Sequence, residues 1–71
     1  DVDLYATLLE PGEKVVREIK SGRHVWVQVA RGEITLNGVT LQAGDGAAIS
    51  DESMVAIEAI LAAEVLLFDL A

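Results

Sequence analysis

The sequence contains no cysteine and only one histidine among its 71 residues. Without cysteine there can be no disulfide, thiolate nucleophile or cysteine-ligated zinc, and this composition fits the cytoplasm, where we expect the protein to reside. Basic residues are also scarce, with five Lys and Arg against twelve Asp and Glu. At a net charge of -7 and a pI near 4.3, the chain lacks the basic clusters that bind phosphates. We therefore expect neither a nucleic-acid partner nor a membrane partner.

No apolar run is long enough for a membrane span, because Glu58, Glu64 and Asp69 interrupt the apolar tail. The opening residues, 1–3, also lack the basic and then apolar start of a signal peptide. The chain is nevertheless 52% hydrophobic, with a mean hydropathy of +0.42. A chain this short buries only a small core. We therefore expect a single domain, residues 1–71, cut from a longer protein, with apolar surface left to face a second copy or another domain.

Short segments of alternating polarity recur between turn signals along the chain. Val25, Val27 and Val29 alternate with more polar neighbours in the clearest of these segments, as a strand with one buried face requires. Residues 54–67 are rich in alanine, which also permits a helix, but their period of two favours a strand. The pattern predicts about eight short strands, at residues 4–10, 14–20, 23–31, 33–36, 39–41, 47–50, 54–60 and 64–70.

The turns between these segments indicate the fold class. Asn37-Gly38 is a strong hairpin signal, because both residues tolerate the positive φ angles of a type I′ turn. Pro11-Gly12 is a second turn signal, and Gly44-Asp45-Gly46 indicates a turn rather than a phosphate-binding loop because no helix follows it. No segment predicts a crossover helix. We expect an all-β jelly roll or small barrel.

The glycine spacing resembles the two motifs of the cupin fold, a jelly roll also described as a double-stranded β-helix. Gly12 and Gly32 match the ends of the first motif, and Gly38, Gly44 and Gly46 match the second. In that family, histidines and a glutamate at fixed positions of these motifs hold a metal. This sequence has other residues at all four positions matched here, which are Glu18, Lys20, Val25 and Ile49.

Three further segments, residues 22–29, 44–48 and 64–70, resemble the C-terminal cupin domain of bacterial pirin-like, quercetinase-type bicupins. The resemblance covers nearly the whole chain. It implies that the metal and the flavonol-cleaving dioxygenase chemistry belong to an N-terminal domain. The C-terminal domain packs against that domain and has lost its ligands. We accordingly predict no catalytic residue, no cofactor and no metal in this chain.

The remaining polar residues are weak candidates for a functional site. His24 lies one position before a ligand position, and strand alternation turns it away from Val25. Glu18 and Lys20 could form an acid/base pair, but two solvated charges explain them better. Because Trp is enriched in interfaces, we predict an outward-facing interface at His24, Trp26 and Gln28.

Three hypotheses follow. The first is a metal-free structural or interaction domain that packs on a partner domain or self-associates. The second is a fragment of a quercetin 2,3-dioxygenase-like enzyme whose active site is in a missing N-terminal domain. The third is a small-molecule binding module, with Val25 and Ile49 lining a pocket where Glu18 or Lys20 orients the ligand.

Overall fold

A computed structural model describes residues 2–50 and 52–70 of the chain, and its described regular structure is all β. None of these residues forms a helix that is long and apolar enough to cross a membrane. The strands are β1 (Val2–Leu9), β2 (Lys14–Glu18), β3 (His24–Leu36), β4 (Val39–Gln42), β5 (Gly46–Ile49) and β6 (Met54–Leu70).

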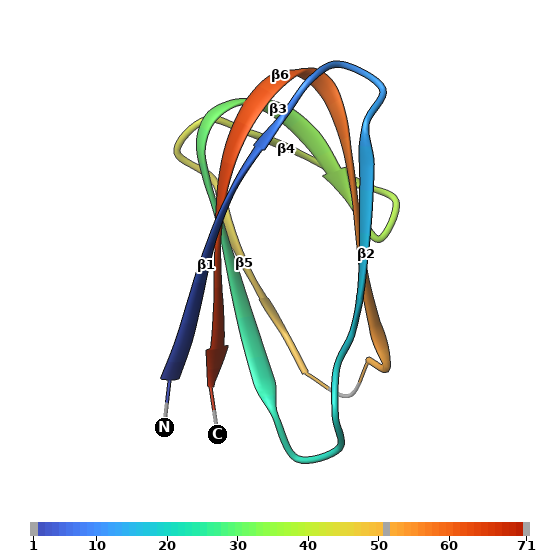
Figure 1. Ribbon diagram of the computed structural model, residues 1–71, viewed down its shortest axis with the longest axis vertical. Coiled ribbons are helices and arrows are strands. Elements are labelled where there is room, and N and C mark those ends of the chain that lie inside the picture. Colours follow the sequence, from blue (N-terminus) through green and yellow to red (C-terminus); the bar gives the residue numbers. More distant parts are fainter. Residues whose placement is uncertain (1, 51, 71) are drawn as a thin grey trace.

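The two longest strands, β3 and β6, bend and so belong to two layers (Figure 1). The first layer contains β1, the second half of β6, the first half of β3 and β5, in that order. The second layer contains β2, the first half of β6, the second half of β3 and β4. All of these pairings are antiparallel.

The prediction of eight strands is wrong in one respect. The strands expected at 23–31 and 33–36 form one continuous strand, β3, and those expected at 54–60 and 64–70 form another, β6. Gly32 does not end a strand, because β3 continues from His24 to Leu36 with bulges on both sides of that glycine. The backbone there has φ +85°, and a Cβ at Gly32 would collide with the carbonyl of Ala62. Glycine at this position therefore allows β3 to bend against the bend of β6, whereas the sequence pattern alone suggests a strand end.

The sheet is also not closed into a barrel. Among the described residues, β1 and β2 each pair with β6 but not with each other, and β4 and β5 each pair with β3 but not with each other. Of the two predicted architectures, the fold is therefore the jelly roll with two layers rather than the closed barrel.

The predicted hairpin at Asn37-Gly38 is confirmed. The two residues have φ +47° and +86°, as a type I′ turn requires. The Asn37 side chain also accepts a hydrogen bond from the Ala56 N–H at 2.7 Å and donates one to the Met54 carbonyl at 3.1 Å. These bonds anchor the hairpin to β6. Residues 54–67 are part of that strand, so the prediction of a strand rather than a helix there is confirmed.

The core lies between the two layers and is entirely aliphatic. Its largest fully buried side chains are Val25, Val27, Val29, Ile34, Val55 and Val65. They come from β3 and β6, the strands shared by both layers. Alternation along these strands therefore directs every second residue of the first layer into the core and the others onto its outer surface.

Candidate functional site

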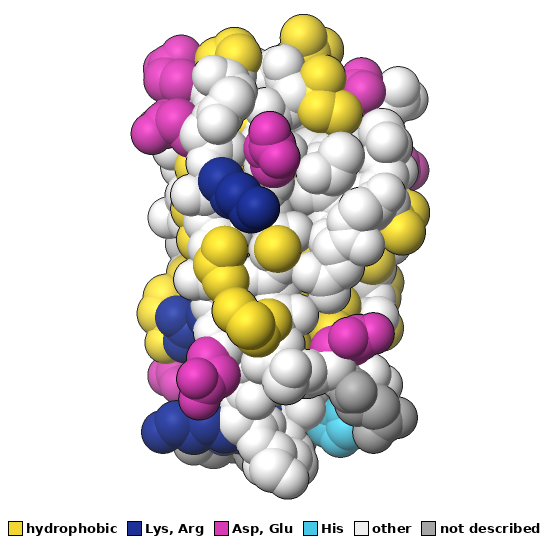
Figure 2. All heavy atoms as spheres, turned by 90° about the vertical axis from the view of Figure 1, so that its right-hand side faces the viewer, with side chains coloured by type: hydrophobic (Ala, Val, Ile, Leu, Met, Phe, Trp, Pro, Cys, Tyr) yellow, Lys and Arg dark blue, Asp and Glu magenta, His cyan; other side chains and the backbone are white. Residues whose placement is uncertain are grey.

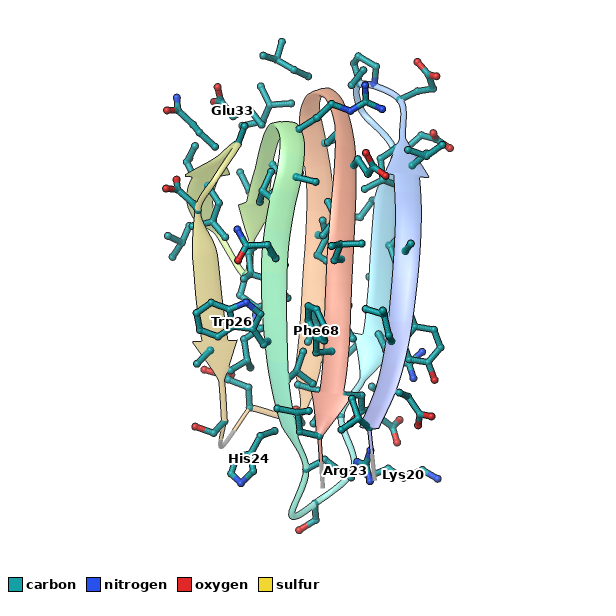
Figure 3. The ribbon with its side chains drawn as sticks, turned by 90° about the vertical axis from the view of Figure 1, so that its left-hand side faces the viewer. Lys20, Arg23, His24, Trp26, Glu33 and Phe68 are labelled. Carbon is teal, nitrogen blue, oxygen red and sulfur yellow. The ribbon has the colours of Figure 1, made fainter. Side chains whose placement is uncertain are left out.

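The outer surface of the first layer is apolar at its centre. In its central row, the strand register aligns Leu4 of β1 with Phe68 of β6, Phe68 with Trp26 of β3, and Trp26 with Ala48 of β5. Figure 3 shows Trp26 and Phe68 on this face. We call the following residues the apolar face: Val2, Leu4, Ala6, Leu8, Leu66, Phe68, Leu70, Trp26 and Ala48.

Several members of the apolar face are in contact with solvent. Leu8 is 73% exposed, Leu4 58% and Trp26 39%, although all three are large hydrophobic residues. Large exposed apolar patches are rare on soluble monomers and mark sites of association. The other two residues of the predicted interface, His24 and Gln28, lie on the same side, next to Leu70 and Leu66.

The Trp26 side chain is held in position by its neighbours. Its indole N–H donates a hydrogen bond to Gln28 Oε1 at 3.3 Å, and the Gln28 amide donates to the carbonyls of Gly44 and Asp45 at 3.2 and 3.1 Å. A Cβ at Gly46 would collide with the indole ring, so the ring lies close to the backbone of β5. A fixed aromatic side chain loses little conformational entropy when a partner covers it.

The outer surface of the second layer is different. Figure 2 shows charged side chains of both signs interspersed with hydrophobic ones on that side of the molecule. Lys14 lies opposite Glu58, and Glu18 lies opposite Met54. Among the described residues, the apolar row that crosses four strands therefore belongs to the first layer.

The four positions matched to cupin metal ligands are divided between two environments. Val25 and Ile49 are buried and lie directly opposite each other on β3 and β5. Glu18 and Lys20 are exposed, while Arg17 and Ile19, their neighbours in sequence, are more buried. Over residues 2–50 and 52–70, no group of three or more His, Asp or Glu side chains could hold a metal ion.

Sequence analysis missed a cluster of charged side chains at the end of the molecule near the chain termini. Arg23 Nε donates to Asp69 Oδ1 at 2.8 Å, and Arg17 lies 3.7 Å from the other Asp69 oxygen. The Arg17 guanidinium also lies 4.0 Å from the centroid of the Tyr5 ring. One signal in the sequence could have revealed this cluster. Leu67 is apolar, and alternation along the strand places Asp69 on the same inner face, where a carboxylate needs a charged partner.

The bent, double-layered all-β fold with an aliphatic interior defines the class of protein as a small cupin domain. In support, a cupin domain of a transcriptional regulator from Enterobacter cloacae superimposes with a TM-score of 0.85 at 18% identity, covering 99% of this chain and 81% of the other. The family model for the quercetinase C-terminal cupin domain matches residues 1–70. The chain belongs to that family.

The relatives that the chain matches are longer proteins. Quercetin 2,3-dioxygenase of Escherichia coli K12 is 46% identical over 70 residues, which are 99% of this chain and 30% of that protein. The crystal structure of the bacterial pirin YhhW from Escherichia coli, in complex with nickel(II), matches with a TM-score of 0.96 at 46% identity, over 99% of this chain and 31% of the other. The chain thus spans about 30% of the length of the relatives it matches.

Proposed function

We propose that this chain is a non-catalytic, metal-free cupin domain that packs through its apolar face on the other domain of a two-domain cupin protein. The apolar face is the observation that supports this role most directly. Burial of its leucines and Trp26 would remove a large apolar surface from water at about 25 cal/mol per Å². The outer surface of the second layer also exposes Val16 and Met54, but charged residues such as Glu58 lie among them.

The other domain is favoured over a second copy of the chain because of the length of the relatives. They contain about twice as much additional chain as the region matched here. A tethered domain acts at an effective concentration on the order of millimolar, so it would cover the apolar face before a second molecule could. Self-association of the isolated chain is then what we expect when that domain is absent.

Any dioxygenase activity of a full-length parent protein is assigned by this proposal to residues outside the chain. Metals used for such chemistry are held by several imidazole or carboxylate groups that converge on one point. Val25 and Ile49 offer only carbon atoms, and the exposed Glu18 and Lys20 do not lie with them in the core. The residues at these four positions, which do not converge on a metal-binding point, thus support a structural role.

The test compares Leu4→Lys with Met54→Lys. The two side chains are similarly exposed, at 58% and 48%, but Leu4 belongs to the apolar face and Met54 lies on the outside of the second layer. Each variant is placed in a chimera in which this chain replaces the matched 70-residue region of the Escherichia coli dioxygenase. We expect the unmodified chimera to unfold in a single thermal transition, and Leu4→Lys to lower its Tm and separate the transitions of the two domains.

Met54→Lys should leave the single transition nearly unchanged. The isolated 71-residue chain should sediment as an oligomer whose size depends on concentration, and Leu4→Lys should convert it to a monomer. Equal effects of the two substitutions in the chimera would contradict the proposal. So would an isolated wild-type chain that remains monomeric at high concentration.

A further inference from the structure

A cavity of about 180 Å³ lies between β1 and β2, on the inner side of both strands. It is present because β1 and β2 pair with β6 but not with each other in the described chain. Its walls are mostly apolar and include Val15, Val55, Ile57, Val65 and Leu67. An apolar cavity of roughly 150 Å³ is known to accept benzene, so this one has room for a single ring with a small substituent.

Arg17 supplies a polar group to the wall of this cavity. Its guanidinium lies over the Tyr5 ring, and its Nε is buried without a hydrogen-bond partner among the described residues. A buried N–H group without an acceptor is unfavourable, and an oxygen atom of a bound molecule would relieve that cost. Thr7, also in the wall, adds a hydroxyl group.

The charges nearby favour an uncharged ligand. Two carboxylates already balance the guanidinium groups of Arg17 and Arg23. Asp69 lies 3.7 Å from Arg17 and 2.8 Å from Arg23. Asp3 lies 3.9 Å from Arg23. The chain as a whole carries a net charge of -7. A carboxylate ligand would be desolvated in an apolar cavity without a surplus positive charge to compensate it.

We propose that this cavity binds a small, uncharged, single-ring aromatic molecule with one acceptor oxygen, which accepts a hydrogen bond from Arg17. This site is distinct from the interior pocket predicted from sequence. Val25 and Ile49 do not line the cavity, and neither Glu18 nor Lys20 contributes to it. The site is also distinct from the apolar face, because the residues of β1 that line it, including Tyr5 and Thr7, alternate with those on the outer surface.

The test uses three single-ring probes: acetophenone, toluene and benzoate. Methyl NMR signals of Val15, Val55 and Val65 report binding in the 71-residue chain, with the Leu4→Lys variant as a second background in case self-association broadens the spectra. We expect acetophenone to bind about fivefold more tightly than toluene, a typical effect of one added hydrogen bond. Benzoate should bind most weakly of the three.

Two substitutions assign the site. Val15→Phe should fill the cavity and abolish the shifts, whereas Val39→Phe on β4, which does not line the cavity, should leave them intact. Arg17→Met should retain toluene binding and remove the preference for acetophenone. The proposal is overturned if acetophenone leaves the methyl signals of the folded chain unchanged, if benzoate binds as tightly, or if Val15→Phe binds as well as Val39→Phe.

Discussion

Trp26 and Phe68 lie directly opposite each other on β3 and β6, at the centre of the outer surface of the first layer. The row continues to Leu4 on one side and Ala48 on the other, so it crosses four strands without a charged residue. Such an alignment is unusual for a surface in contact with water, where strands normally alternate apolar inward and polar outward. Here the centre of the first layer is apolar on both faces, as expected for a sheet covered on both sides.

Trp26 is the only tryptophan in the chain, so its fluorescence reports directly on the apolar face. We expect the emission to shift to shorter wavelength as the concentration of the isolated chain rises, because association removes water from the indole ring. Dilution should reverse the shift, and Leu4→Lys should prevent it. Emission that does not change with concentration, in a sample that ultracentrifugation shows to be oligomeric, would place the contact elsewhere.

Gly32→Ala should destabilise the fold by about 3 kcal/mol, from left-handed backbone strain and overpacking together. A Cβ at this position would meet the carbonyl oxygen of Ala62 and the Cα of Ala63. Gly12→Ala is the matched control, because Gly12 has φ +86° but no atom within 4 Å of the added Cβ. That variant should lose only about 1 kcal/mol. Urea unfolding of both variants measures the difference, and equal losses would show that the bend does not depend on this close contact.

Asp69→Asn should lower the free energy of unfolding by about 2 kcal/mol, since it weakens charge-assisted hydrogen bonds in a partly buried site. Arg23 donates to this carboxylate from Nε at 2.8 Å and to the Asp69 backbone carbonyl at 3.2 Å. Glu64→Gln breaks the exposed pair of Glu64 with Arg31, 3.2 Å apart, and should cost no more than about 0.5 kcal/mol. Chemical denaturation at low and high salt would compare the two, and similar small losses would mean that the Asp69 cluster contributes little.

The purified chain should retain far less than one equivalent of metal after incubation with Ni²⁺, Fe²⁺ or Cu²⁺ followed by gel filtration. The reason is the aliphatic character of the interior, where Val25 and Ile49 have no donor atoms. Elemental analysis of the eluted protein gives the result. Near-stoichiometric metal that is lost in a His24→Ala variant would show that this exposed histidine helps to form a site.

Much of the fold could be predicted from local sequence patterns. The alternation from Val25 to Val29 was sufficient to separate buried from exposed residues of β3, because a strand turns successive side chains to opposite sides. Asn37-Gly38 was sufficient to predict the hairpin, because the residues themselves favour the required φ angles. The same alternation predicted that His24, Trp26 and Gln28 share one side. Their role as an interface remains a prediction.

Other features depend on contacts between residues distant in the sequence. Gly32 resembles a strand end in sequence, and only its approach to Ala62 explains why β3 bends and continues there. Likewise, Arg17 and Asp69 are far apart along the chain. They meet because β2 pairs with the first half of β6, and the bend of β6 places its second half, with Asp69, in the opposite layer (Figure 1). The sequence by itself therefore determined the strands, turns and alternation of faces, which depend on neighbouring residues. The tertiary structure decided how the strands bend, which rows align into the apolar face, and where the cavity lies, because these depend on which strands pair.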